Sequence, residues 1–172
     1  PGNAQQPGGS TLQGQWHYVG GDAYHQRYSS LDQIHAGNFQ DLETAWVWRG
    51  NNFDPSPARG KPIYVDGVLY SVVGNRRTVV AIDAGTGETL WTYREPHTTR
   101  WARSTRRGHG KGVAYGELDG QGVIFVSTPA FFLHALDAKT GRHLENWGTG
   151  VPLPGFPEAG VIDLLADVLN GW

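Results

Sequence analysis

The chain has 172 residues, of which 12% are aromatic and only 17% charged, with 25 glycines and no cysteine. This length fits a single domain with a sizeable core, and the bias toward aromatic residues and glycine favours short strands and tight turns over helices. A formal net charge of -2 argues against a nucleic-acid or membrane-surface role, and the absence of cysteine excludes disulfides and thiolate metal sites. No apolar run approaches the roughly 20 residues of a membrane span.

The first third of the chain contains little regular structure. Residues 1–14 are rich in Pro, Gly and Gln, and we expect a flexible tail. Residues 15–30 are dense in aromatic residues and glycine, which favours a loop that covers one face of a sheet assembly. A short helical turn is predicted over 31–38 and a half-buried strand over 42–48, followed by a Pro-broken loop over 51–61.

The remainder is organised by a repeat, because most of residues 63–91 recurs in residues 119–147. In each copy a turn with glycine, Asp66-Gly67 or Gln121-Gly122, opens an apolar strand, and a second strand ends in an Asp-Ala-x-Thr-Gly turn. Strands are expected at 68–70, 79–82, 123–126 and 132–136. An antiparallel meander of about four strands in roughly 40–50 residues is a β-propeller blade, so the predicted class is all-β.

Three residues are candidates for acid–base chemistry or metal binding. Asp83 and Asp137 are tempting acids, but their place inside the Thr-Gly turns predicts that they hydrogen-bond their own backbone. His134 lies on an apolar strand and is predicted to be a hydrogen-bonded core residue, not a metal ligand.

A basic stretch, residues 97–111, lies between the two copies and contains no acidic residue. Its cations are Arg100, Arg103, Arg106, Arg107 and Lys111. Two interpretations stay open: a solvated loop, or an anion site, since Arg forks match carboxylates and glycine lets the backbone approach closely.

After the second copy, residues 151–157 are too rich in proline for regular structure. An amphipathic helix of about three turns is predicted next, because apolar residues recur at helical spacing. These residues are Val161, Leu164, Leu165, Val168 and Leu169. The predicted organisation is therefore a tail over 1–14, propeller blades over 15–150, and a Pro-rich linker with a short helix over 151–172.

The turn motif resembles that of a known family. AIDAGTGETLW, Ala81 to Trp91, is similar to the tryptophan-docking motif of the PQQ-dependent, or quinoprotein, dehydrogenases of alcohols and glucose. The second copy keeps Ala135 and the Thr-Gly pair, but its Trp147 comes two places late. YVGGDAYHQRYSSLDQI, KPIYVDGVLY and GHGKGVAYG also resemble family segments, so the resemblance covers roughly residues 15–150.

The resemblance implies an eight-bladed propeller, of which this chain is expected to cover about two blades and part of another. It implies oxidation of an alcohol or sugar hydroxyl with pyrroloquinoline quinone (PQQ) as cofactor and a calcium ion as Lewis acid. The calcium ligands and the catalytic base are expected outside this chain, in the remainder of the propeller on the same or a separate polypeptide. A periplasmic or secreted location and an electron-acceptor protein such as a cytochrome c are also expected.

Position by position, two residues are candidates for cofactor binding. Lys111 stands where the family has an Arg that contacts the quinone oxygens, and Arg59 stands where relatives have a Glu near the quinone. The adjacent Cys pair of many alcohol-oxidising members has no counterpart. These departures keep two alternatives open, a non-catalytic propeller scaffold or interaction module, and a propeller enzyme that uses another cofactor or metal.

Overall fold

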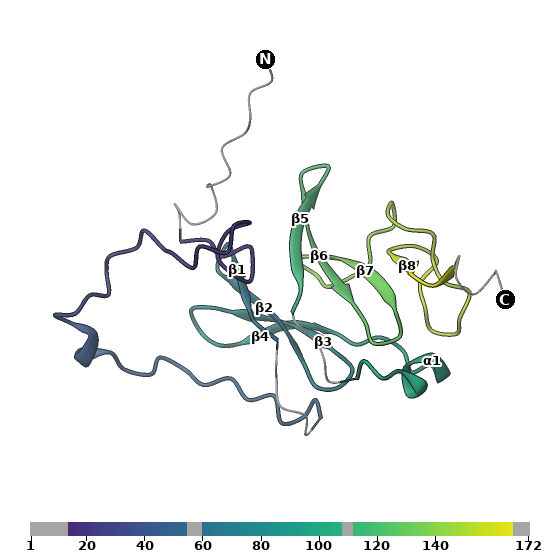
Figure 1. The fold of residues 1–172 in the computed structure, drawn as a ribbon, viewed down its shortest axis with the longest axis horizontal. Helices are drawn as coiled ribbons and strands as arrows, with labels where there is room; N and C mark the ends of the chain where they lie inside the picture. The colour runs from purple at the N-terminus through teal and green to yellow at the C-terminus, as the bar shows by residue number, and fades with distance from the viewer. Residues whose placement is uncertain (1–13, 55–59, 108–111, 167–172) are drawn as a thin grey trace, which may run out of the picture.

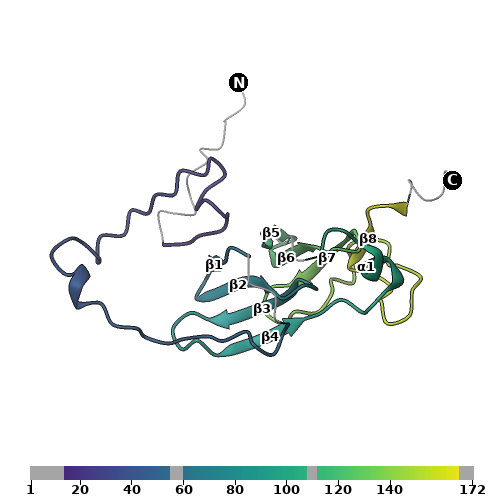
Figure 2. The ribbon, with the colours of Figure 1, turned by 60° about the horizontal axis from the view of Figure 1, so that its bottom comes forward.

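The computed structural model describes residues 14–54, 60–107 and 112–166. Two four-stranded antiparallel sheets lie next to each other, and in each the strands follow one another in chain order (Figures 1 and 2). The all-β class and the repeated four-stranded meander predicted from the sequence are therefore confirmed. No helix within the described ranges has the length and hydropathy of a membrane span.

The first sheet is a regular meander. Its strands are β1 (Ile63–Val65), β2 (Val68–Val73), β3 (Thr78–Asp83) and β4 (Thr89–Tyr93). Asp66 and Gly67 close the β1–β2 hairpin with φ of 46° and 84°, the left-handed pair that a two-residue type I′ turn requires. The predicted turn is thus confirmed.

The second sheet has a longer first hairpin. Its strands are β5 (Ala114–Leu118), β6 (Gln121–Ser127), β7 (Phe132–Asp137) and β8 (Val161–Asp163). The turn lies at Asp119 and Gly120, with φ of 51° and 77°, so the predicted turn at Gln121-Gly122 is wrong. Val123 still corresponds to Val68, because each pairs with the Asp of its Thr-Gly turn, but β6 begins two residues earlier.

The predicted C-terminal helix is wrong at its start, where a strand forms the outer edge of the second sheet. Val161–Asp163 pairs with β7 as β8 and does not form a first helical turn. Pairing satisfies the open edge of β7 and buries Val161 completely, whereas an isolated helix of about three turns is marginal in water. Residues 167–172 lie outside the described ranges, as do residues 1–13 of the predicted tail.

The two sheets share one core, to which both contribute apolar side chains. From the first sheet come Ile63, Val65, Tyr70, Val72, Val79 and Ala81, and from the second sheet and its approach come Val113, Ile124, Val126, Leu136 and Ala138. At one end of this interface the Trp91 indole donates to the carbonyl oxygen of Ala138 at 2.9 Å. A Cβ on Gly141 would lie 2.5 Å from that indole, so only glycine permits this approach.

Residues 42–48 do not form the predicted strand, and Val47 is 65% exposed. No described strand pairs with this segment, although the Trp48 indole donates to the Thr89 hydroxyl of β4 at 2.9 Å. Its Trp46 nevertheless repeats the contact of Trp91, because the indole donates to the carbonyl of Ala84 at 3.0 Å. A Cβ on Gly87 would lie 2.6 Å from that ring.

The remaining predictions for the first third have different outcomes. Residues 51–54 and 60–61 contain no strand or helix, as predicted for the Pro-broken loop over 51–61. The helical turn predicted over 31–38 is displaced to a 3₁₀ turn, η2 (Phe39–Asp41). In residues 15–30, predicted to form a covering loop, Trp16 forms an isolated bridge with Tyr64 at the edge of β1, and His17 packs against Tyr115 of β5 with ring centroids 4.9 Å apart. Both Tyr24 and Tyr28 are exposed.

Candidate functional site

The beginnings of β1 and β5 meet at one end of the sheets. A Cβ on Gly112 would lie 3.0 Å from the carbonyl oxygen of Lys61, so the segments that lead into β1 and β5 contact each other. Lys111 and Arg59, the predicted cofactor-binding residues, lie outside the described residues, and their roles stay predictions. Their described neighbours come together, which locates the candidate site at this end of the blades.

A recess of about 300 Å³ opens at the same end. It lies between the hairpins that join β2 to β3 and β6 to β7, and it is lined by Arg77, Arg106, Gly112, Ser127, Thr128, Phe131 and Leu164. Arg77 donates to the carbonyl oxygens of Ser127 at 2.7 Å and of Arg106 at 3.4 Å. Burial and the nearby charge of Arg106 lower the pKa of Arg77, and the charge of Glu95 partly opposes this shift. No carboxylate is among the described residues that line the recess.

Phe131 gives the recess an aromatic wall in a strained conformation. Its φ is 63°, a region that bulky residues rarely adopt, and its side chain is 36% exposed. The hairpin imposes this conformation, because Phe131 donates to the carbonyl of Thr128 at 3.0 Å and accepts from the amide of Leu164 at 3.0 Å. Such strain persists where the surrounding structure over-determines it, and it is frequent at functional sites.

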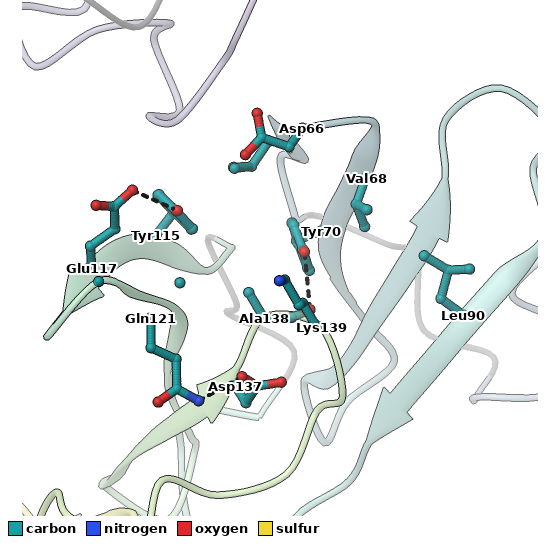
Figure 3. A pocket seen from close by; sticks show the side chains of 13 residues that line it. Asp66, Val68, Tyr70, Leu90, Tyr115, Glu117, Gln121, Asp137, Ala138 and Lys139 are labelled. Atoms are coloured by element: carbon teal, nitrogen blue, oxygen red, sulfur yellow. Dashed lines mark hydrogen bonds between the residues drawn. The ribbon is translucent and has the colours of Figure 1, made fainter.

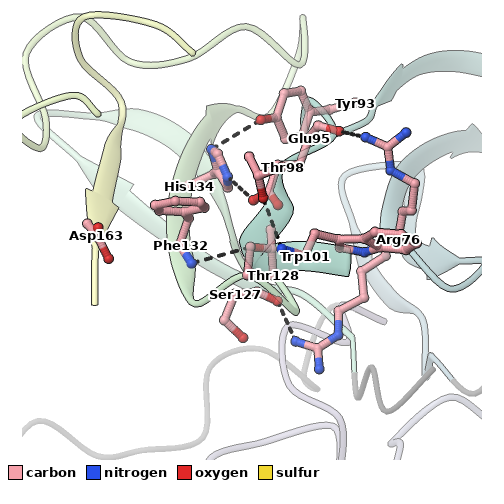
Figure 4. A network of polar contacts seen from close by, with 12 residues as sticks. Arg76, Tyr93, Glu95, Thr98, Trp101, Ser127, Thr128, Phe132, His134 and Asp163 are labelled. Carbon is pink, nitrogen blue, oxygen red and sulfur yellow. Dashed lines mark hydrogen bonds and ion pairs between the residues drawn. The ribbon is translucent and has the colours of Figure 1, made fainter. Parts of the chain in front are cut away.

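Beside the recess a buried polar network joins the sheets (Figure 4). His134, fully buried on β7, contacts Glu95 through Nε2 at 2.9 Å. Its Nδ1 faces the Tyr93 hydroxyl at 3.2 Å and Nε2 of His143 at 3.0 Å. Arg76 donates to the carbonyl oxygen of Glu95. The prediction that His134 is a hydrogen-bonded core residue is confirmed.

The network strongly favours particular charge states. Burial, and secondarily His134, lowers the pKa of His143 to about 4, so His143 is neutral near pH 7. Burial, followed by the charge of Glu95, raises the pKa of Tyr93, which stays protonated. The second carboxylate oxygen of Glu95 is buried and has no hydrogen-bond partner among the described residues. Glu95 therefore depends on His134 for its side-chain hydrogen bond.

The basic stretch separates into different environments. Arg100, on α1 (Thr99–Arg103), makes a bidentate ion pair with Asp163 at 2.6 and 2.8 Å, which lowers the pKa of that carboxyl. Arg107 lies 5.5 Å from the Trp101 ring centroid, within cation–π range. Arg106 faces the recess, whereas Arg103 is exposed and does not line it. The stretch is thus not a uniformly solvated loop, and Asp163 supplies an acidic partner from far along the chain.

A second hollow, a groove of about 700 Å³, lies at the opposite end of the sheets, near the Asp66-Gly67 turn (Figure 3). Tyr70 and Tyr115 line it together with acidic side chains. The Tyr70 hydroxyl donates to the carbonyl of Ala138 at 3.0 Å. Burial, with nearby Tyr115 and carboxylates, raises the pKa of Tyr70 to about 12. The tyrosine is thus a fixed wall of the groove and no acid or base near pH 7.

The two tempting acids are structural, as predicted. Asp83 Oδ1 accepts from the Thr86 amide at 2.8 Å and from its hydroxyl at 3.0 Å, and these bonds lower the Asp83 pKa. Asp137 repeats both bonds with Thr140 at 2.7 Å. Burial tends to raise the Asp137 pKa, but hydrogen bonds from Gln121 and Thr140 outweigh it and the pKa is lowered. Across the described ranges no three His, Asp or Glu side chains gather to hold a metal ion.

Sequence reasoning missed several residues of this end of the blades. Arg76, Arg77 and Glu95 carried no motif, and Asp163 was assigned to a helix. One signal was present: two adjacent arginines, Arg76 and Arg77, stand between apolar strands, where a hairpin tip places them beside its neighbour.

The two antiparallel meanders pack face to face, and the Thr-Gly turn of each one accepts a hydrogen bond from a tryptophan indole. Four-stranded meanders in this arrangement are blades of a β-propeller. The sequence matches the family described as "PQQ: Glucose/ethanol/alcohol dehydrogenase, beta-propeller domain" over residues 16–170. The chain belongs to this family.

Curated relatives include a quinohemoprotein alcohol dehydrogenase of Comamonas testosteroni, 35% identical over 134 residues, which are 78% of this chain and 18% of that protein. A 1-butanol dehydrogenase (cytochrome c) of Thauera butanivorans is 34% identical over 134 residues, 76% of this chain and 18% of that protein. The chain thus spans less than a fifth of the length of these relatives.

Solved structures agree in fold. The crystal structure of the Comamonas testosteroni quinohemoprotein alcohol dehydrogenase has a TM-score of 0.64 and 32% identity, covering 77% of this chain and 19% of that one. A europium-containing methanol dehydrogenase has a TM-score of 0.62 and 26% identity, covering 77% of this chain and 23% of that one.

Proposed function

We propose that this chain is the amino-terminal portion of a quinoprotein dehydrogenase that oxidises an alcohol or sugar hydroxyl and passes the reducing equivalents to PQQ. The observation that carries the proposal is the meeting of the β1 and β5 approaches, where Gly112 touches Lys61 beside a cationic recess. Family membership and relatives that are alcohol dehydrogenases support it.

The residues at this end fit the chemistry of the cofactor. PQQ is an ortho-quinone with three carboxylates, and the described lining offers two guanidinium groups, Arg77 and Arg106, and no carboxylate. In the proposed site the Lys111 ammonium donates a hydrogen bond to a quinone oxygen as a point charge, and Arg59 meets a carboxylate. When bound, the quinone supplies the acceptor for the hydride of the substrate.

The remaining assignments belong to the same proposal. The catalytic base and the ligands of a calcium ion come from parts of the propeller outside this chain, and the described residues only bind and orient the cofactor. The contacts of Trp46 and Trp91 with the Thr-Gly turns are this chain's form of the tryptophan-docking motif. We place the protein in the periplasm or outside the cell, with a cytochrome c as a candidate electron acceptor.

Reconstitution of the full-length protein tests the proposal. With PQQ and calcium we expect a change in quinone absorbance and dye-linked oxidation of alcohols or sugars. Lys111→Ala should weaken PQQ binding by about tenfold or more, because a hydrogen bond from a charged group contributes about 1.5–3 kcal/mol. Lys111→Arg should retain binding, and Lys139→Ala, in the opposite groove, serves as the matched control.

A different outcome would favour the scaffold alternative. If neither an absorbance change nor turnover appears with any alcohol or sugar, the propeller binds no quinone and acts as an interaction module. Unchanged PQQ affinity in Lys111→Ala would remove Lys111 from the site.

A further inference from the structure

The groove of about 700 Å³ near the Asp66-Gly67 turn lies at the end of the sheets opposite the proposed cofactor site (Figure 3). Both blades contribute to it. Asp66 comes from the β1–β2 turn, Glu117 from β5 and Asp137 from the end of β7. A volume of this size is within the range of small-molecule sites.

The described lining of the groove carries more negative than positive charge. It contains three carboxylates, Asp66, Glu117 and Asp137, and one ammonium, Lys139. None of the three carboxylates makes an ion pair with a described residue. Burial lowers the pKa of His17 in spite of the charges of Asp66 and Glu117, so His17 is neutral near pH 7 and does not offset them. Residues 1–13, which precede this part of the chain, contain no charged side chain.

Neutral groups supply the side-chain hydrogen bonds that these carboxylates accept. The bonds are Gln15 to Asp66 at 2.8 Å, the Tyr115 hydroxyl to Glu117 at 3.1 Å, and Gln121 to Asp137 at 2.7 Å. In Asp66 and Glu117 these bonds use one carboxylate oxygen, and the second oxygen of each has no partner among the described residues. Such bonds orient a carboxylate without neutralising it, so the groove retains its attraction for a cation.

Two tyrosine rings form fixed walls between these acids (Figure 3). Tyr70 is almost completely buried, and its hydroxyl is held by the carbonyl of Ala138 at 3.0 Å. Tyr115 is held by its bond to the carboxylate on the same strand, and a Cβ on Gly122 would lie 3.1 Å from its hydroxyl, so glycine leaves room for this ring. Aromatic rings attract cations through their quadrupole. Aliphatic surface is added by Val65, Val68 and Leu90.

We propose that this groove binds a small organic cation, a protonated amine with an apolar or aromatic body. The ammonium lies next to Asp66 and Glu117, and the body lies against Tyr70 and Tyr115. Complementary charge selects this class over anions, and the aromatic walls select it over small hydrated ions. The site is separate from the proposed function, because the groove and the cofactor site lie at opposite ends of the blades.

Isothermal titration calorimetry on the full-length protein tests the site. The probe is 2-phenylethylammonium, and it is compared with neutral 3-phenylpropanamide and anionic 3-phenylpropanoate. We expect the amine to bind about tenfold more tightly than either, as a charge-assisted contact predicts. Its affinity should fall as NaCl is raised, since salt screens partly exposed charges.

Conservative variants of the two open carboxylates test the charge. Asp66→Asn and Glu117→Gln keep the oxygen that accepts the existing hydrogen bond, and asparagine also tolerates the φ of 46° at position 66. Each should weaken amine binding about threefold, and the double variant about tenfold, because partly exposed ion pairs contribute modestly. The matched control is Glu145→Gln, an exposed position outside the described lining, which should change affinity less than about twofold.

Two other positions test the remaining features of the groove. Lys139→Gln removes the competing cation and should tighten amine binding about threefold. Tyr115→Leu removes an aromatic wall and should weaken it about threefold, whereas Tyr115→Phe keeps the ring and should retain it. Thermal unfolding shows whether each variant is folded, and the carboxylate variants carry the test if Tyr115→Leu is not.

Several outcomes would overturn the proposal. Equal affinity for the amine and the amide would remove the role of charge, and equal losses in Glu117→Gln and Glu145→Gln would place the cation elsewhere. Binding of a lysine-rich peptide without any binding of the small amine would identify a protein-docking surface instead. Failure of PQQ to bind the wild-type protein, with amine binding still sensitive to Glu117→Gln, would contradict the proposed function and support the cation site.

Discussion

The two blades begin alike and end differently. In the first blade β4 is one continuous segment that pairs with β3 across a single register shift, and it carries Trp91 onto the next blade. In the second, Ala135 accepts from the amide of Leu144 and donates to the carbonyl of Gly160, so residues 145–159 leave the outer edge and β8 resumes it. The comparison teaches that the Thr-Gly turn determines where the third strand ends, while the outer strand can be assembled from distant residues.

The two blades also differ in the equivalent sheet faces that carry Val80 of β3 and His134 of β7. Val80 of β3 packs among Trp46, Trp48 and Phe53, in an apolar contact. His134, at the equivalent position one residue before the motif alanine, faces the first blade through a buried polar network. The first face is covered mainly by apolar side chains, whereas the interface between the two sheets adds a buried polar network to its shared apolar core.

Replacing His134 should have the largest effect. His134→Val copies the first blade, but it leaves the Glu95 carboxylate buried without its partner. We expect the free energy of unfolding to fall by about 3–5 kcal/mol in urea denaturation. The double variant His134→Val/Glu95→Met removes both partners and should recover most of that loss. Equal losses in the single and double variants would contradict the importance of the pair.

The docking contact between the blades comes next. Gly141→Ala places a Cβ against the Trp91 ring in a left-handed conformation, so backbone strain of about 1–2 kcal/mol adds to overpacking of about 1–3 kcal/mol. The matched control is Gly120→Ala, which has a similar φ and no atom within 4 Å of the added Cβ. Thermal unfolding should separate the two, and equal destabilisation would mean that the indole contact contributes little.

The pH dependence of stability should also distinguish the blades. The pKa of His143 is lowered in the folded protein to about 4, so the unfolded chain binds the proton first. Its stabilising contribution is complete above its ordinary pKa of about 6.5 and is lost as pH falls from there toward 4. In the first blade Thr89 occupies the matching place and does not titrate.

His143→Gln should therefore flatten the stability profile between about pH 6.5 and 4, the window between the unfolded and folded pKa. Asp83 and Asp163, whose pKa values are lowered from 3.8, act below this window and should leave it unchanged. A profile in His143→Gln as steep as that of the wild type would contradict the assignment of this loss to His143.

The smallest effect is expected at the ion pair that ties α1 to β8. Arg100→Gln removes the bidentate contact with Asp163 and the position 4.6 Å from the Phe132 ring centroid. Because both side chains are partly exposed, we expect a loss of about 1 kcal/mol that shrinks in high salt. A loss that is unchanged by salt would point to packing on Phe132 as the main contribution.

Much of the fold could be predicted because the repeat is local. Alternating apolar residues, glycine turns and the Asp-x-x-Thr-Gly segments predicted both meanders, and the structural roles of Asp83 and Asp137 followed from turn chemistry alone. Errors came where partners are distant: β8 was read as a helix because its apolar spacing fits both, and only the open edge of β7 decides. Trp46 was placed on a strand although its role is a side-chain contact.

By itself, the sequence determined the all-β blades, the Thr-Gly turns and the resemblance that family membership confirms, since these depend on interactions between near neighbours in the chain. Tertiary structure alone decided that Arg77 and Arg106 share a recess, that Asp163 neutralises Arg100, and that Glu95 meets His134. Such pairs join residues between 29 and 63 positions apart. No periodicity records them, because the packing of one sheet on another brings these charges together.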